Sequence, residues 1–225
     1  MSVGSLDIIT NGLVFYVDGA NDKSYPGTGT SWNDLTSGAS NGVLTNGPTF
    51  NSSNGGSIVF DGINDYVSFT SNNKLAITGD MTICAWIYVN SLSGYNGIVG
   101  KTNGGFPNPY DLYTNPSSGA LTFLRGNGSI YDLSVSTNGV TINKWQFVAV
   151  TMASSTVTHY LDGRSNGSST LSTSISDGGT PMYIGSRNDG GTMMNGKISN
   201  VIIYNRALTP SEVLKNYNKL KWRFL

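Results

Sequence analysis

Charged residues, cysteine, histidine and glutamate are all scarce in this chain. Only 12% of its 225 residues are charged, 13 basic against 13 acidic, so the charge balance does not favour nucleic acid or an anionic membrane surface as a partner. Cys84 is the sole cysteine, which excludes an intrachain disulfide. It lies in an apolar stretch, where we expect a buried and inert thiol.

Segments for export or membrane insertion are also missing from the sequence. No basic segment followed by an apolar run opens the chain, and no apolar run approaches the roughly 18 residues of a membrane span. We therefore expect synthesis and assembly in a cytoplasm, with no membrane insertion.

Carboxylate pairs of the kind used in catalysis are absent as well. Glycoside hydrolysis generally uses two carboxyl groups on opposite sides of the scissile bond. Glu212 is the only glutamate, and Asp111 and Asp132 show no paired spacing. His159, the only histidine, cannot by itself build a metal triad or a Ser-His-Asp set. We expect no enzymatic activity and no required cofactor.

Short apolar stretches, separated by glycine, asparagine and serine, recur about every ten residues. This spacing predicts an all-β protein, a two-sheet antiparallel jelly-roll sandwich, and the length suits a single domain over 1–225 with an N-terminal arm at 1–10. Beyond the opening hairpins, strands are predicted at 97–101, 110–114, 120–125, 130–135, 144–152, 156–161, 182–186 and 197–204.

Apolar side chains at alternating positions predict which residues face the core. The prediction comprises Ile58, Phe60, Val67, Phe69, Ile83, Trp86, Phe147, Val150, Ile184, Val201 and Ile203.

An acidic turn separates two of these predicted strands. Asp61, Asn64 and Asp65 place several side-chain oxygens within five residues. Such oxygens can hold a calcium ion, or they can accept hydrogen bonds from the backbone of the turn. Both interpretations stay open, and these three residues are the best candidates for calcium ligands.

One short helix is predicted, over 210–221. Thr209 suits the N-cap, Pro210 the first turn, and Glu212 the positive end of the helix dipole. The predicted apolar stripe comprises Val213, Leu214, Tyr217 and Leu220. The basic residues near its end, Lys215, Lys219, Lys221 and Arg223, complement the dipole and do not indicate a nucleic-acid patch.

Both ends of the chain carry apolar residues outside the predicted core, namely Leu6, Ile8, Ile9, Trp222, Phe224 and Leu225. Two interpretations remain for the tail 222–225: it contacts other subunits, or it folds back onto its own sandwich.

Two polar segments are candidates for a sugar-binding site. The predicted loop 102–111 supplies Phe106, Asn108, Tyr110 and Asp111, and the turn 187–191 supplies Asn188 and Asp189. Aromatic rings can stack on sugars, while amides and carboxylates can bind hydroxyls. The same residues could instead cap the core and shape turns, and the sequence does not discriminate between these roles.

The motif Phe-Asp-Gly-x-x-Asp-Tyr-Val at 60–67 resembles the hairpin of laminin-G-like jelly rolls in the concanavalin A-like lectin/glucanase superfamily. Further segments resemble that family in the same order, at 12–18, 32–35 with 41–44, 81–89, 144–151 with 160–163, and 196–212. The resemblance implies the jelly-roll fold. Glucanases of this superfamily carry two glutamates flanking an aspartate on one strand, a pattern that this chain lacks.

Within this family, the chain resembles single-domain laminin-G-like proteins of tailed bacteriophages at 23–27, 44–50, 216–218 and 223–224. This resemblance implies a non-enzymatic structural protein on the virion surface, either an external capsid decoration or a tail-fibre attachment module, assembled in the host cytoplasm. Its partners would be other virion proteins and copies of itself, as a homo-oligomer. The alternative is a carbohydrate-binding lectin or adhesin that recognises host-surface glycans, with or without calcium.

Overall fold

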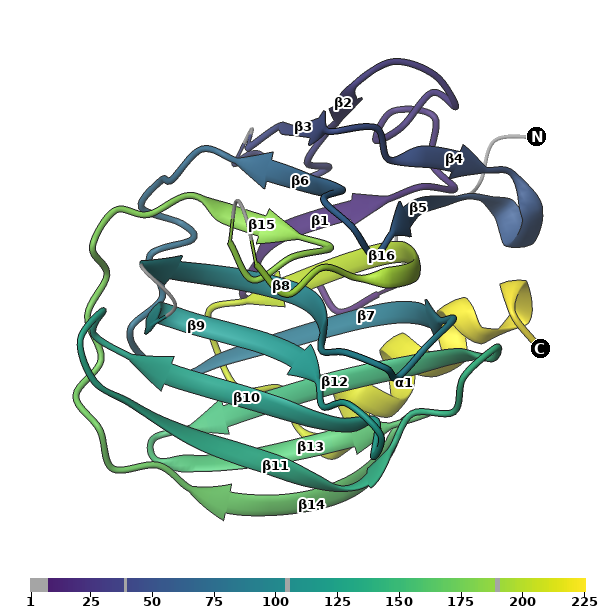
Figure 1. Ribbon diagram of the computed structural model, residues 1–225. Coiled ribbons are helices and arrows are strands. Elements are labelled where there is room, and N and C mark those ends of the chain that lie inside the picture. The colour runs from purple at the N-terminus through teal and green to yellow at the C-terminus, as the bar shows by residue number, and fades with distance from the viewer. Residues whose placement is uncertain (1–7, 39, 104–105, 189–190) are drawn as a thin grey trace.

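The computed structural model describes residues 8–38, 40–103, 106–188 and 191–225, which form two antiparallel sheets packed face to face (Figure 1). Sheet A has the order β14 (Arg164–Thr170), β13 (Thr156–Leu161), β12 (Trp145–Ala153), β7 (Met81–Val89), β16 (Asn195–Tyr204), β5 (Ser57–Asp61) and β4 (Thr49–Asn51), with β1 (Leu13–Asp18) also paired to β16. Sheet B has the order β11 (Tyr131–Gly139), β10 (Ala120–Gly126), β9 (Phe106–Thr114), β8 (Asn96–Asn103), β15 (Met182–Ile184), β6 (Tyr66–Phe69), β3 (Gly42–Thr45) and β2 (Ser31–Trp32). The predicted all-β jelly-roll sandwich is confirmed.

The prediction of a loop at 102–111 is wrong, because most of this segment belongs to the paired strands β8 and β9. Lys101 lies opposite Tyr110, and Thr102 lies opposite Pro107. Pairing of β8 with β9 across this hairpin therefore overrides the local glycine and proline content, which had favoured a loop.

The main core lies between the sheets and contains nine of the eleven residues that alternation predicted: Ile58, Phe60, Val67, Phe69, Ile83, Val150, Ile184, Val201 and Ile203. The other two, Trp86 and Phe147, are fully buried but face the opposite side of sheet A. The reason is the period of the strand: Ile83, Ala85 and Ile87 of β7 point inward, so Trp86 must point outward.

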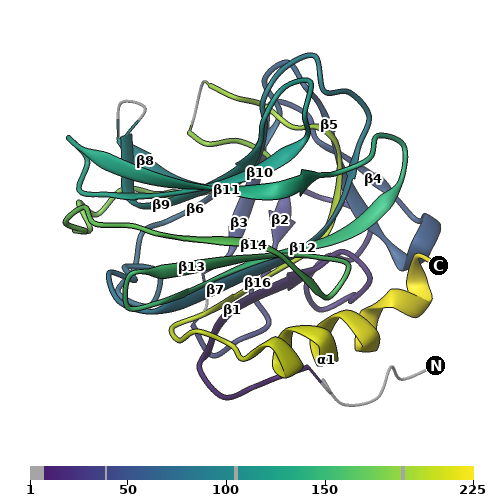
Figure 2. The same ribbon diagram turned by 90° about the horizontal axis from the view of Figure 1, so that it is seen from below.

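A second apolar cluster forms where helix α1 (Pro210–Leu220) covers the outer side of sheet A (Figure 2). Thr209 caps the helix as predicted, since its hydroxyl accepts from the Glu212 amide while the Glu212 carboxylate accepts from the Thr209 amide. Val213 and Leu220 are buried as predicted, whereas Leu214 is exposed on the solvent side.

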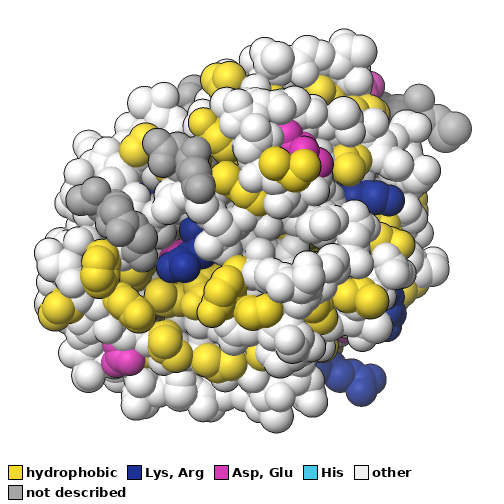
Figure 3. Space-filling view, viewed as in Figure 1, with side chains coloured by type: hydrophobic (Ala, Val, Ile, Leu, Met, Phe, Trp, Pro, Cys, Tyr) yellow, Lys and Arg dark blue, Asp and Glu magenta, His cyan; other side chains and the backbone are white. Residues whose placement is uncertain are grey.

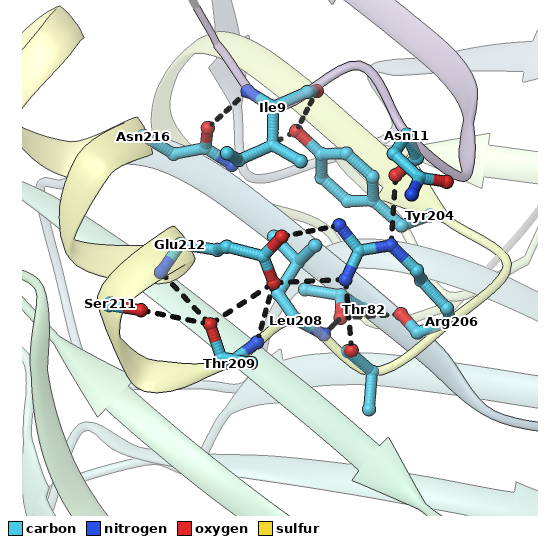
Figure 4. A network of polar contacts seen from close by, with 11 residues as sticks. Ile9, Asn11, Thr82, Tyr204, Arg206, Leu208, Thr209, Ser211, Glu212 and Asn216 are labelled. Atoms are coloured by element: carbon cyan, nitrogen blue, oxygen red, sulfur yellow. Dashed lines mark hydrogen bonds and ion pairs between the residues drawn. The ribbon is translucent and has the colours of Figure 1, made fainter.

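Polar contacts attach the helix to β16 and to the described part of the N-terminal arm (Figure 4). Asn216 accepts from the Ile9 amide at 2.9 Å and donates to the Tyr204 hydroxyl at 2.9 Å. That hydroxyl donates in turn to the Ile9 carbonyl at 2.9 Å. Ile8 is buried in the same cluster, while Leu6 lies outside the described residues.

The tail continues as a 3-10 turn, η2 (Lys221–Arg223), and folds back onto its own sheet. Phe224 stacks on Trp86 with ring centroids 4.2 Å apart. The Arg223 guanidinium is buried and pairs with Asp18 at 2.9 Å. The intramolecular interpretation therefore holds for these two residues, whereas Trp222 and Leu225 are 69% and 73% exposed.

Candidate functional site

The outer face of sheet B is a broad surface of mixed apolar and polar side chains. The one α-helix of the described residues covers sheet A, on the other side of the sandwich (Figure 2). Figure 3 shows a band of hydrophobic side chains across β9, β10 and β11, beside a basic and an acidic side chain. We refer to this outer side of β8–β11 as the open face.

Alternation along the strands determines which side chains reach the open face. On β9, Tyr110 and Leu112 join the core, so Asp111 and Tyr113 point to the other side. On the edge strand β11, every second residue is exposed and apolar: Tyr131, Leu133 and Val135. Large apolar side chains are usually buried in the core. Their exposure in a row on an edge strand therefore indicates a contact surface.

Four aromatic residues, which we call the aromatic track, extend over the open face. Tyr95 packs edge-on against Tyr113, with ring centroids 5.5 Å apart. Phe106 packs against Tyr131 at 5.8 Å. Three of these rings keep substantial free surface, since Tyr95, Tyr131 and Phe106 are 48%, 46% and 39% exposed.

An arginine–aspartate pair lies beside the track. The Arg187 Nε donates to Asp111 Oδ2, and the guanidinium carbon lies 4.5 Å from the centre of the Tyr113 ring. Asp111 is fully buried, whereas the Arg187 side chain is partly exposed. Burial raises the pKa of Asp111 to about 6, although the Arg187 charge acts in the opposite direction.

Two glycines of β8 allow the Arg187 segment to lie directly on the sheet. A Cβ added to Gly100 would collide with the Arg187 backbone, and one added to Gly97 would collide with the backbone of Ser186 and Thr192. Thr102 also donates to the Arg187 carbonyl at 3.0 Å. Arg187 is therefore held by its backbone as well as by its side chain.

The structure separates the residues that the sequence nominated for sugar binding. Phe106 and Asp111 belong to the open face, and Asn188, which is half-buried, directly follows Arg187. Tyr110 is fully buried, with its hydroxyl donating to the Leu75 carbonyl at 3.0 Å. Asn108 is also buried, with its side-chain amide against Gly178, so neither of these two side chains is accessible to a sugar. Asp189 lies outside the described residues.

Four residues of the site were not predicted: Tyr95, Tyr113, Tyr131 and Arg187. The available signal was the alternation of Tyr131, Leu133 and Val135, which places large apolar side chains on the face opposite to Ser134 and Ser136.

The acidic turn uses its oxygens on its own backbone. Asp61 Oδ1 accepts from the Ile63 amide at 2.8 Å, and Asp65 Oδ2 accepts from the Asp61 amide at 3.1 Å. Burial raises the pKa of Asp65. Asn64 lies in the same turn, as predicted, but no group of three acidic, histidine or cysteine side chains suited to a metal occurs among the described residues. Calcium binding by Asp61, Asn64 and Asp65 stays a prediction.

The remaining candidates for chemistry have structural roles. Glu212 caps α1 and pairs with Arg206, which lowers the pKa of Glu212 to about 2. His159 is buried with Nε2 2.8 Å from the Ser134 hydroxyl, and burial lowers the pKa of His159 to about 4. Cys84 is buried, and burial raises its pKa to about 12, which fits the predicted inert thiol.

Within the described ranges, no helix combines the length and apolar character that crossing a membrane would require.

Comparison with known proteins identifies the fold family. The profile of Laminin_G_3, described as concanavalin A-like lectin/glucanases superfamily, matches residues 61–214. No curated protein matches the chain.

Several solved structures share the fold at low identity. The binding domain of Paraclostridial Mosquitocidal Protein 1 is 18% identical, with a TM-score of 0.71, over 93% of this chain and 52% of that one. The receptor binding domain of botulinum neurotoxin C/D mosaic serotype is 14% identical, with a TM-score of 0.72, over 94% and 52%. Trypanosoma rangeli sialidase in complex with sialic acid is 19% identical, with a TM-score of 0.69, over 97% and 34%.

This chain thus spans about half the length of the two binding domains and about a third of the sialidase. At such identities the likeness concerns the fold alone. Because the family profile covers most of the chain, the protein belongs to the laminin-G-like family of the concanavalin A-like lectin/glucanase superfamily.

Proposed function

We propose that this protein is a non-enzymatic carbohydrate-binding module whose sugar site is the open face of sheet B. The observation that carries the proposal is the aromatic track: three exposed rings beside a positioned arginine, on a sheet face that no described helix covers.

The chemistry of the open face suits a sugar chain. Sugar rings present apolar C–H surfaces that stack on aromatic rings, and hydroxyls or charged substituents that need directed hydrogen bonds. Tyr95, Tyr131 and Phe106 supply the first kind of contact, and Arg187 the second. A sheet face that no described helix covers also suits a chain that extends beyond the site, such as a glycan attached to a cell surface.

The comparisons support the proposal at the level of fold. The superfamily name includes lectins, and the similar structures include a receptor binding domain and a sialidase in complex with sialic acid. These properties belong to those proteins, and the residues of the open face carry the proposal for this one.

A role on a virion surface is the second candidate. The exposed Trp222 and Leu225 favour it, since Arg223 and Phe224 hold them at a fixed position from which they can contact a neighbouring subunit. Mass spectrometry of purified particles from the source organism would test this role. A sugar site and a particle location are compatible in one protein.

Screening the protein on a broad glycan array, with and without calcium, tests the sugar-binding proposal. We expect saturable binding to a defined glycan class, lost in Tyr131→Ala and retained in Trp222→Ala. The second variant is a matched control, because it also removes an exposed aromatic side chain, but at the chain end. Absence of glycan binding, or equal loss in both variants, would contradict the proposal.

A further inference from the structure

We infer that the glycan bound at the open face is acidic, and that a carboxylate of the sugar binds the free edge of the Arg187 guanidinium. This inference rests on the proposed sugar-binding function and specifies its ligand class.

The guanidinium is held on one edge and open on the other. Its Nε donates to Asp111, and Tyr113 supports its planar face. No hydrogen bond joins Nη1 or Nη2 to any described residue, and the side chain is 19% exposed. Two parallel N–H donors at the end of a fixed planar group match the two oxygens of a carboxylate.

The acceptor of the pair is shielded from any ligand. Asp111 Oδ2 is occupied by Arg187, and Asp111 Oδ1 is fully buried without a partner. A neutral sugar hydroxyl, which both donates and accepts, would therefore meet only donors from this pair. A carboxylate, which only accepts, uses those donors fully and gains a charge-assisted hydrogen bond.

Among the described residues, the open face carries one accessible positive charge rather than a basic patch. Lys101 and Arg125 are the only basic residues in the strands of sheet B, and both are fully buried. Lys101 pairs with Asp177, and Arg125 donates to the Ile77 carbonyl at 2.8 Å. A single cation beside aromatic rings fits one carboxylated sugar within a mostly neutral glycan, whereas a densely charged polyanion would need several cations.

The test compares matched ligands on the unaltered protein. Sialylated and uronic-acid oligosaccharides are immobilised beside their desialylated or carboxyl-reduced counterparts, and dissociation constants are measured. We expect the acidic member of a bound pair to bind about tenfold more tightly, as one charge-assisted bidentate contact provides. Equal binding within pairs, or binding of neutral glycans alone, would overturn the inference while leaving the sugar-binding function intact. Absence of binding to every glycan would overturn both.

Two variants assign the preference to Arg187. Arg187→Lys keeps the positive charge but loses the planar fork, so the ratio of the two dissociation constants within a pair should fall below about threefold. Arg187→Gln removes the charge, so the two members of a pair should bind with about equal dissociation constants. A thermal melt of each variant checks the fold, and the ligand pairs on the unaltered protein decide the question if a variant does not fold. An unchanged ratio in Arg187→Lys and Arg187→Gln would contradict the assignment.

Discussion

The outer faces of the two sheets carry similar aromatic side chains in different surroundings. Outside sheet A, Trp86 is enclosed by Tyr217 at 5.7 Å and Phe224 at 4.2 Å, both supplied by the C-terminal segment. Outside sheet B, Tyr131 and Phe106 contact each other and remain partly exposed to solvent. An outward aromatic side chain therefore stabilises the fold where the chain covers it, and is available to a partner where the chain does not.

The arginine–aspartate pairs of the two faces show the same difference. On the sheet A side, the Arg223 guanidinium donates to Asp18, to Ser199 Oγ at 2.6 Å and to the Asn54 carbonyl at 3.1 Å, so all three nitrogens are used. On the sheet B side, the described partners of Arg187 engage Nε alone. Because all its nitrogens donate hydrogen bonds within the fold, Arg223 serves as a structural anchor. The Arg187 guanidinium donates hydrogen bonds to described residues through Nε alone, which indicates a binding site.

Removal of a ring from each face gives the largest expected contrast. Trp86→Ala should lower the free energy of unfolding by about 3–5 kcal/mol, because it empties a large enclosed aromatic site. Tyr131→Ala should lower it by less than about 1 kcal/mol, because that ring is half exposed. Urea denaturation of both variants measures the difference, and similar losses would show that the open face is also part of the folded core.

The tail provides the next contrast. Arg223→Ala should cost about 3 kcal/mol, since it leaves Asp18 buried without its charge partner, although Tyr16 still donates to that carboxylate at 2.8 Å. The neighbouring Trp222→Ala should change stability by less than about 0.5 kcal/mol. If both substitutions were neutral in thermal melts, the tail would not be anchored to its own sheet.

Acid should change the stability contributions of two buried groups, His159 and Asp111, in opposite directions. The pKa of His159 is lowered to about 4, so its contribution to stability is complete above about 6.5 and is lost as the pH falls toward 4, by about 3 kcal/mol. The pKa of Asp111 is raised to about 6, so its burial penalty diminishes as the pH falls from 6 toward 4.

Because these two contributions oppose each other, the free energy of unfolding of the whole protein changes little with pH. The test therefore compares the unaltered protein with His159→Gln. From pH 7 to pH 4, the unaltered protein should lose about 3 kcal/mol relative to the variant in urea denaturation. A stability difference independent of pH would show that His159 titrates normally and is not enclosed.

Calcium should give the smallest of these contrasts in stability. A weak site at the acidic turn, with Kd about 1 mM, would stabilise the protein by about 1.4 kcal/mol at 10 mM calcium. Asp61→Asn should remove this stabilisation, whereas the exposed Asp22→Asn should not. Identical melting temperatures in calcium and in chelator would eliminate the site.

The fold could be predicted from local patterns, because alternation and turn chemistry act over a few residues. The positions of Trp86 and Phe147 could not, since alternation shows that a face is buried but not whether a sheet or a helix covers it. The site was predicted only in part, because its residues come from segments that are distant in the sequence. Phe106 and Asp111 were nominated from one segment, whereas Arg187 and Tyr131 reach the same face through pairing of distant strands. Strand order is a property of the whole chain, and no local motif encodes it.

The most direct test of the central claim, that the open face of sheet B binds the ligand, is an amide chemical-shift titration of the labelled protein with a glycan selected on the array. We predict that perturbed amides cluster at 95, 106–113, 131–135 and 186–188, while those of α1 and β7 stay unchanged. Perturbations centred on the helix-covered side, with none on β9 to β11, would contradict the account.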